Sequence, residues 1–312
     1  MSGLPFLKNF IGYLRKNNYS EETIYSYERD LKSFSNFLNK DGIQFSEITN
    51  VLIEKYKDYI SSQERKTAKN KESIKMLSSF SINRMICGLR SYLRYLINIG
   101  YKTPASPEIL KSVKNKRRQV TNVTLDEQIK LIESPTKFEK NKIVALRNRA
   151  MLETIFSTGM RISELINLKK VQIDKTGRIF IMGKGKKERF VYLTHRAQEH
   201  LKNYLEIRGI IDSPYLFIPY KGKNVHKKDK KISPNYLQEK IKRYRELLGL
   251  NIPVSAHGIR HAFATYLAES GANPAAIQIL LGHESLDTTT RYVHASDRYA
   301  EKTHKKYHPL KE

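Results

Sequence analysis

Residues 257–292 read HGIRHAFATYLAESGANPAAIQILLGHESLDTTTRY, with three histidines, an arginine just before the second of them and a tyrosine at the end. Ser255 is suited to cap a helix that begins near Ala256, because its hydroxyl can accept a hydrogen bond from a backbone N–H of the first turn. On that helix His257 and Arg260 are three residues apart, so they share one face. Groups gathered in this way suit phosphate chemistry on DNA better than they suit a protein core.

Two further helices are expected within this stretch. Gly271 ends the first helix, and Asn273 followed by proline opens the second, which stops near Gly282. His283 therefore lies just past a helix end, where its side chain can point into a cleft. A third helix, preceded by a polar run that can cap it, carries Tyr292.

A zinc site is the alternative interpretation of the histidines. His257 and His261 are four residues apart, as in the zinc-binding H-E-x-x-H helix. Gly258 stands where that motif needs a glutamate, and Arg260 would repel a metal cation. We therefore expect no metal site, and a metallohydrolase is a distant third interpretation. For Tyr292 the plain alternative is an ordinary core or surface role, since the chain has 19 tyrosines.

The composition points to a polyanionic partner. The 57 lysines and arginines face 31 aspartates and glutamates, a formal net charge of +26 that exceeds what solubility needs. Nucleic acid is the first candidate, because the chain has no basic amphipathic anchor and no apolar run near the ~20 residues of a membrane span. The single cysteine, Cys87, rules out an internal disulfide and fits a reducing cytoplasm. The N-terminus does not read as a convincing signal peptide.

Three motifs together resemble the C-terminal signature of the tyrosine recombinases, in particular their phage integrase and Xer branch. They are H-x-x-R-H at residues 257–261, L-L-G-H ending at His283, and a tyrosine nine residues further on (292 − 283). Upstream, residues 158–165 read TGMRISEL and match the T-G-x-R-x-S-E-L box of this family at every fixed position. The resemblance is strong from about Gly159 onward and looser before it.

The resemblance implies six catalytic residues, which are Arg161, Lys184, His257, Arg260, His283 and Tyr292. Lys184 matches the lysine of the family's mobile β-hairpin, because residues 183–187 form a glycine- and lysine-rich turn between expected strands at 178–182 and 188–193. Lys186 is the alternative, since the register of the turn cannot be fixed from sequence. A solvated hairpin tip is the plain interpretation of the same residues.

These residue types fit the cleavage of a phosphodiester. Tyr292 would attack phosphorus, Arg161 and Arg260 would offer planar forks to the non-bridging oxygens, and His283 could add a hydrogen bond there. His257 could accept the tyrosine proton or bind phosphate. The hairpin lysine would protonate the departing 5′-oxygen. A covalent phosphotyrosine stores the bond energy and the motifs hold no magnesium-type acid cluster, so we expect no cofactor.

The expected fold class is mainly α with a small β-sheet (α+β). Residues 1–110 resemble the helical, SAM-like core-binding domain of the family, and residues 111–120 read as an extended basic linker that would run along DNA. Residues 121–312 form the catalytic domain, with a C-terminal tail that in the family docks on a neighbouring protomer.

Helix-capping signals support this division. Expected helix starts stand at Ser20, Thr49, Thr124, Thr194 and Ser233. The strongest amphipathic helix of the N-terminal part carries its apolar stripe over residues 82–97. Arg84, Arg90 and Arg94 lie off that stripe, where they would either contact phosphates or form a solvated face.

As a whole, the resemblance implies a site-specific recombinase that cuts and rejoins DNA through a 3′-phosphotyrosyl intermediate. Four protomers would act on two copies of a short, partly palindromic site, and a DNA translocase could activate them. Xer-type chromosome dimer resolution is the favoured role, and integration or transposition of a mobile element is the alternative. A type IB topoisomerase-like enzyme and a non-catalytic DNA-binding protein are disfavoured, the first by length and the L-L-G-H box, the second because all six catalytic positions are filled.

Overall fold

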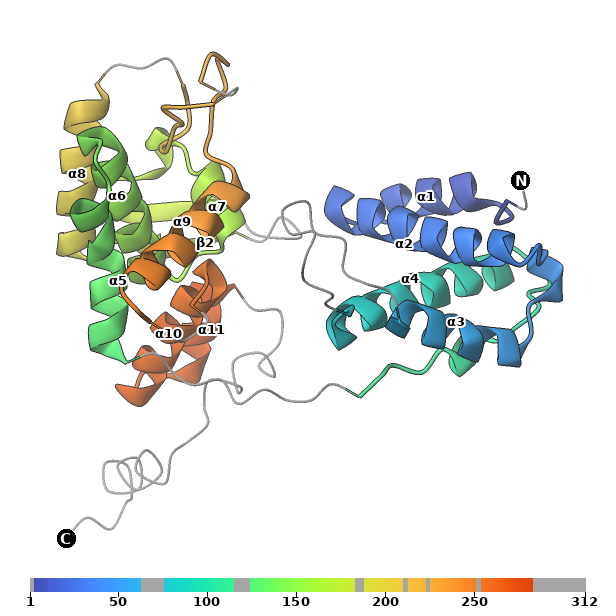
Figure 1. Cartoon of the computed structure of the whole chain (residues 1–312). Helices are drawn as coiled ribbons and strands as arrows, with labels where there is room; N and C mark the ends of the chain where they lie inside the picture. The colour runs from blue at the N-terminus through green and yellow to red at the C-terminus, as the bar shows by residue number, and fades with distance from the viewer. Residues whose placement is uncertain are drawn as a thin grey trace, which may run out of the picture. The chain divides into compact units, whose positions relative to one another are not determined.

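A computed structural model describes residues 3–62, 76–114, 124–182, 188–209, 213–222, 225–250 and 254–282. The chain divides into two compact units, Met1–Gln119 and Val120–Glu312. In the described part both are helical, and the second also holds one two-stranded antiparallel sheet (Figure 1). The mainly α class with a small sheet is therefore confirmed. None of the helices that the structure describes is long and apolar enough to span a membrane.

The N-terminal unit is a bundle of amphipathic helices. They are α1 (Leu7–Lys16), α2 (Glu21–Lys40), α3 (Asn50–Ser62) and α4 (Ser79–Asn98), with short 3-10 turns η1 (Phe45–Glu47) and η2 (Pro107–Ile109). Helix α1 is absent from the helices expected from sequence, although Phe10, Ile11 and Leu14 give it a buried stripe. Lys8 breaks that apolar run in sequence, but on a helix it falls outside the stripe.

The arginines of α4 do not form the fully solvated basic face that their spacing suggests. Arg84 is bonded to the buried carboxylate of Asp30 on α2, and Arg90 donates to the carbonyl of Leu110. Leu110 itself is fully buried in this unit's core. These two arginines therefore fasten α2 and the segment after η2 to α4.

The capping residues expected from sequence are present. Each hydroxyl accepts a hydrogen bond from the backbone N–H three residues on, as at Ser20, Thr124, Thr194, Ser233 and Ser255. Thr124 also forms the expected reciprocal box, since its own N–H donates to the Glu127 carboxylate at 2.9 Å. Local chemistry thus fixes where these helices begin.

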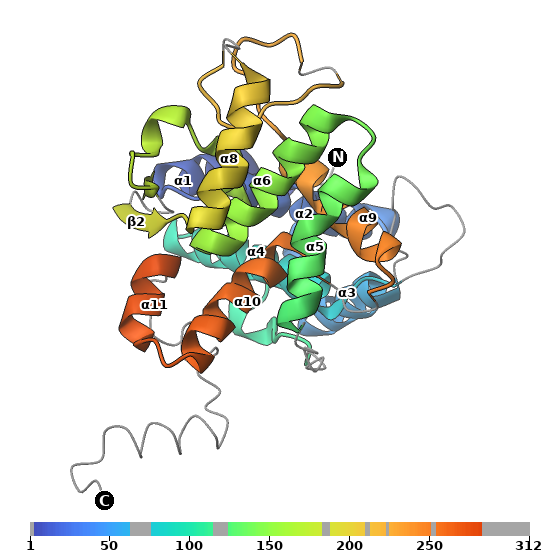
Figure 2. The ribbon, with the colours of Figure 1, turned by 90° about the vertical axis from the view of Figure 1, so that its left-hand side faces the viewer.

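The C-terminal unit is organised around α6 (Lys142–Thr158). This helix packs against α5 (Leu125–Phe138), α8 (His195–Arg208) and α10 (Ala256–Glu269), and α10 lies beside α11 (Pro274–Leu281) in Figure 2. Helix α9 (Pro234–Leu247) contacts α5 and the short helix α7 (Ile162–Asn167), and η3 (Lys170–Gln172) leads into the sheet. The main core of this unit is one apolar cluster, and a smaller second cluster lies between α10 and α11.

Strands β1 (Arg178–Met182) and β2 (Glu188–Tyr192) pair in antiparallel register, with Phe180 opposite Phe190. Alternate residues of each strand are buried, as the period of two requires. The turn between the strands, which carries Lys184 and Lys186, lies outside the described residues. The base of the expected hairpin is therefore confirmed, and its two lysines stay predictions.

Candidate active site

Three of the six expected catalytic residues lie in the described part of the chain. They are Arg161, His257 and Arg260, and all three belong to the C-terminal unit. Lys184, His283 and Tyr292 lie outside the described residues, as does the alternative lysine, Lys186. The described part of the site therefore consists of these three residues and the elements that hold them.

A glycine at the end of α6 sets the first arginine in place. Gly159 ends the helix in the left-handed conformation, with φ +62°. A Cβ at this position would lie 2.4 Å from a ring carbon of Phe263 on α10, so only glycine lets the two helices approach. Two residues later Arg161 occupies the position just before α7.

Arg260 joins the ends of two helices. Its side chain is 2% exposed, although arginine is rarely buried without partners. One terminal nitrogen donates to the carbonyl of Gly159 at 2.7 Å, and the other donates to the carbonyl of Leu281 at 2.7 Å. Both oxygens are main-chain groups with partial charge, so they orient the guanidinium without cancelling its charge.

Arg161 approaches the same helix end from the other side. Its guanidinium donates to the carbonyl of Gly282 at 3.2 Å and lies 3.5 Å from the carbonyl oxygen of Leu281. The two arginines of the H-x-x-R and T-G-x-R motifs therefore meet at one carbonyl group, although they are far apart in sequence. That carbonyl lies two residues before His283.

A buried ion pair supports this arrangement, and sequence reasoning missed its arginine. Arg189 on β2 binds the two carboxylate oxygens of Glu164 at 2.7 and 3.0 Å and donates to the carbonyl of Leu280 at 2.9 Å. Glu164 also accepts from the backbone N–H of Arg161 at 2.7 Å and from the guanidinium of Arg161 at 3.2 Å. The missed signal was the register of β2, which places Arg189 on the same inward face as Val191.

The charge state of Glu164 follows from these contacts. Burial would raise the pKa of its carboxyl, but hydrogen bonds from Arg189 and the Arg161 backbone outweigh burial and lower that pKa. The ionised carboxylate therefore links the arginine box, strand β2 and, through Arg189, the end of α11. Gly282 has φ +62°, and a Cβ there would lie 3.0 Å from the Arg189 guanidinium, so glycine is favoured there too.

His257 lies one turn from Arg260 on α10. Burial lowers the pKa of its imidazole, and the charges of Arg260 and Arg161 lower it further. His261 also has a lowered pKa, from burial and then from His257. The described residues contain no group of three or more potential ligands that could hold a metal ion. The lowered pKa favours the neutral imidazole form of His257 at pH 7.

Solved structures of similar fold define the class. A XerH site-specific recombinase bound to palindromic difH substrate is 25% identical, with a TM-score of 0.70 over 90% of this chain and 79% of that one. A lambda integrase dimer bound to a core site shares the fold at 19% identity and a TM-score of 0.69, covering 94% of this chain and 77% of that chain. Fold and site together define a tyrosine recombinase, an enzyme class that cleaves and rejoins DNA.

Sequence comparison identifies the family. Residues 122–298 match the phage integrase family, and residues 7–100 match the phage integrase N-terminal SAM-like domain. The chain belongs to the phage integrase family of site-specific tyrosine recombinases. It is 32% identical to tyrosine recombinase XerC of Thermodesulfovibrio yellowstonii over 98% of this chain and 96% of that protein. It is 31% identical to tyrosine recombinase XerD of Staphylococcus aureus over 93% of both chains.

Proposed function

We propose that this protein is a Xer-type recombinase that resolves chromosome dimers by cutting and rejoining DNA at a specific site. The observation that carries the proposal is the match to proteins named XerC and XerD over nearly the whole length of both partners. Integration or transposition of a mobile element would use the same chemistry and is the alternative role. The two roles differ in the DNA that the enzyme attacks.

The proposed nucleophile is Tyr292. Its phenolic oxygen forms a bond to phosphorus, the bond between phosphorus and the 5′-oxygen breaks, and Lys184 supplies the proton that the departing 5′-hydroxyl needs. A 5′-hydroxyl then attacks the 3′-phosphotyrosyl bond in the reverse sense and releases the tyrosine. Because the covalent bond stores the energy, this scheme requires neither ATP nor a metal ion.

Arg161 and Arg260 would bind the non-bridging oxygens of the reacting phosphate. Support comes from their geometry, since both guanidinium groups approach the carbonyl of Leu281. Fixed cations need no reorganisation when charge develops on phosphate, which is the main source of such stabilisation. His283, two residues after Leu281, would add a hydrogen bond to the same oxygens.

His257 has two roles open to it. A neutral imidazole can accept the proton of Tyr292 as a general base, or donate a hydrogen bond to phosphate through its protonated ring nitrogen. The lowered pKa of His257 favours the neutral form that both roles use.

We also propose an assembly. Residues 1–110 would grip DNA as the core-binding domain, residues 111–120 would form the basic connector, and the C-terminal tail of residues 121–312 would dock on a neighbouring protomer. Four protomers would join two short, partly palindromic sites in the cytoplasm, and a DNA translocase could activate them. Basic charge in such a connector would contact phosphates without reading sequence.

Covalent trapping tests the proposal. Cells that express the protein are lysed in denaturant, and DNA that stays attached to it is sequenced, with Tyr292→Phe as the control. Attached DNA from the wild type alone, concentrated at one chromosomal locus, is the expected result. Attached DNA enriched at the ends of a mobile element would favour integration over dimer resolution. Equal attachment in Tyr292→Phe would overturn the choice of nucleophile.

A further inference from the structure

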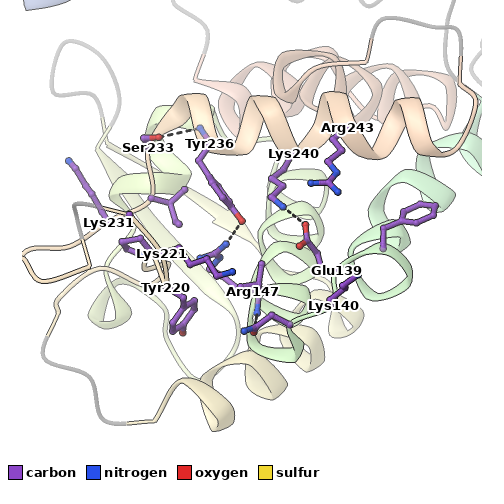
Figure 3. A pocket seen from close by; sticks show the side chains of 16 residues that line it. Glu139, Lys140, Arg147, Tyr220, Lys221, Lys231, Ser233, Tyr236, Lys240 and Arg243 are labelled. Carbon is purple, nitrogen blue, oxygen red and sulfur yellow. Dashed lines mark hydrogen bonds and ion pairs between the residues drawn. The ribbon is translucent and has the colours of Figure 1, made fainter.

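The C-terminal unit holds a second basic site that shares no residue with the arginines of the candidate active site. It is a pocket of about 470 Å³ bounded by residues 138–141, residues 219–222 and the inner face of α9 (Figure 3). Side chains from α5, α6 and α9 and from the segment before α9 converge on it. We refer to it as the α9 pocket.

The lining of the α9 pocket is strongly cationic. Its six basic residues are Lys140, Arg147, Lys221, Lys231, Lys240 and Arg243. The lining has one carboxylate, Glu139, which binds Lys240 at 2.5 Å and accepts from Tyr244 at 2.6 Å. These hydrogen bonds, helped by the charge of Arg243, lower the pKa of Glu139 although burial opposes them. The carboxylate is thus already engaged, and most of the pocket's positive charge is left unbalanced.

Arg147 forms the floor of this pocket and is 2% exposed. It donates to the carbonyl of Ile218 at 2.8 Å, to the amide oxygen of Asn148 at 2.9 and 3.1 Å, and to the hydroxyl of Tyr236. Its guanidinium also lies 4.8 Å from the ring centre of Tyr236 and 5.3 Å from that of Tyr220. All of these partners are neutral groups, so they fix the cation and leave its charge in place.

A neighbouring arginine shows that this arrangement is not a general property of α6. Arg149, two residues on and also buried, binds the carboxylates of Glu153 at 2.8 Å and Glu133 at 3.3 Å. A buried charge normally acquires such a counter-charge, because desolvation without one is costly. Arg147 lacks a carboxylate partner within the described residues, so its field extends into the pocket.

We propose that the α9 pocket is a second phosphate-binding site, which takes a DNA phosphodiester distinct from the one that is cut. This inference rests on the proposed function, because it assumes that DNA is the substrate. Lys140, Lys221 and Arg243 are exposed, and no ion pair holds them within the described part of the chain, so they are free to reach a phosphate. The N-terminus of α9 adds its partial positive charge at Ser233, and its first turn begins beside the pocket.

Such a site would hold the duplex in place without reading its sequence. Phosphate contacts set the register and orientation of a protein on DNA. Each phosphate contact that a variant loses makes its DNA binding less sensitive to salt. The α9 pocket therefore contributes to affinity and alignment. Its lining contains none of the candidate active-site residues Arg161, His257 and Arg260.

The test compares two variants with the same loss of charge. Lys140→Gln, Lys221→Gln and Arg243→Gln are combined in the pocket variant. The control combines Lys169→Gln, Lys175→Gln and Lys202→Gln, which are exposed lysines of the same unit outside the pocket. All six side chains are exposed, so both variants are expected to fold, and thermal denaturation checks this.

Binding of the full-length protein to a DNA duplex is measured as a function of salt. We expect the pocket variant to bind at least about tenfold more weakly than the control, with the slope of log K against log salt reduced by about 1 or more. Equal affinity and slope in the two variants would overturn the proposal, even if wild-type cleavage proceeds normally.

Two further experiments show whether the pocket binds DNA phosphate or a free nucleotide, and whether the proposed function holds independently of the pocket. Replacing single DNA phosphates by neutral methylphosphonates should weaken the wild type at one position away from the cut and leave the pocket variant unaffected there. If ATP competes for the wild-type pocket while DNA binding is identical in both variants, the site serves free nucleotides and the DNA assignment is wrong. If the wild type binds DNA through the pocket but never forms a covalent complex, the proposed recombinase function is contradicted while the proposed phosphate site is supported.

Discussion

Two regions around α6 hold arginines with different kinds of oxygen. In the ion cluster shared by α5, α6 and α8, Arg149 and Arg196 bind the carboxylates of Glu133 and Glu153 at 2.7 to 3.3 Å. At the candidate active site, Arg260 donates to main-chain carbonyls, and Arg161 donates to main-chain carbonyls as well as to the carboxylate of Glu164 at 3.2 Å. Carboxylates cancel the charge of an arginine, whereas carbonyls only orient it.

This difference separates arginines that maintain the fold from arginines that can act on a ligand. A neutralised ion cluster contributes to stability through its buried hydrogen bonds. It attracts an incoming anion only weakly, because its positive charges are already balanced. Main-chain carbonyls orient a guanidinium without removing its charge, so a phosphate that binds later can still interact with that charge. The comparison predicts that stability and catalysis respond to different arginines, and each prediction below tests that separation.

The largest effect is expected from Glu153→Gln in the ion cluster. Glu153 is 3% exposed and serves both Arg149 and Arg196, so its neutralisation leaves the buried Arg149 with the more exposed Glu133, at 3.3 Å, as its remaining carboxylate partner. The free energy of unfolding should fall by about 3–5 kcal/mol, as measured by urea denaturation. Glu246→Gln is the control, because its pair with Lys242 is exposed and should contribute about 0–1 kcal/mol. Equal losses in the two variants would mean that the cluster is not neutralised as its geometry indicates.

The next effect is expected from Arg260→Lys. A lysine keeps the charge but loses the fork that reaches two carbonyls, so the rate of covalent complex formation should fall by about 10²–10³-fold. Arg149→Lys is the matched control, since it changes a buried arginine on the neighbouring helix. It should lower stability while the folded protein cleaves at the wild-type rate. If Arg149→Lys slowed cleavage as much as Arg260→Lys does, the separation between the two regions would be wrong.

Arg189 is the intermediate case, because it lies beside the active-site arginines and shares the carboxylate of Glu164 with Arg161. Arg189→Lys removes the two-point contact with Glu164 and the bond to Leu280, so Arg161 loses its support. We expect about tenfold slower cleavage at saturating DNA, an effect of about 1.4 kcal/mol on the barrier, together with a loss of stability. Combining it with Glu164→Gln should add little, since both changes break one contact. Full additivity in the double variant would show that the two residues act separately.

The sequence predicts local features of this fold and site well. Helix starts follow from serine and threonine caps, and the arginine box and H-x-x-R pair are recognised from spacing within a few residues. Arg189 and Arg147 were not singled out, because their partners are distant in sequence. Glu164 is 25 residues from Arg189, and Ile218 is 71 residues from Arg147. A cation at an inward position of a strand or helix is the one local signal that such a partner exists.

The fold also shows what spacing cannot decide. The basic residues of α4 were expected to face phosphates or solvent, and Arg84 instead binds a buried aspartate on α2. Periodicity places a side chain beside an apolar stripe, but only the packing of a second helix reveals a carboxylate there. Lys184, His283 and Tyr292 rest on the family motif alone and stay predictions.

The smallest effect is expected from pH, and it concerns His257. Burial and the charges of Arg260 and Arg161 lower the pKa of this imidazole below about 6.5, its ordinary value. Cleavage should therefore be flat around pH 7 and fall only when the pH drops through the lowered pKa and the imidazole becomes protonated. In the same acidic range the unfolded chain binds more protons than the folded one, so stability should decrease as the pH falls below the pKa that His257 has in the unfolded chain.

The measurement is the single-turnover rate of cleavage against pH, with His257→Gln as the control. The acidic decline attributed to this residue should disappear in that variant. A decline that begins above pH 6.5 in the wild type, or that persists in the variant, would assign the titration to another group. The two arginines would then not be what sets the pH dependence of cleavage through His257.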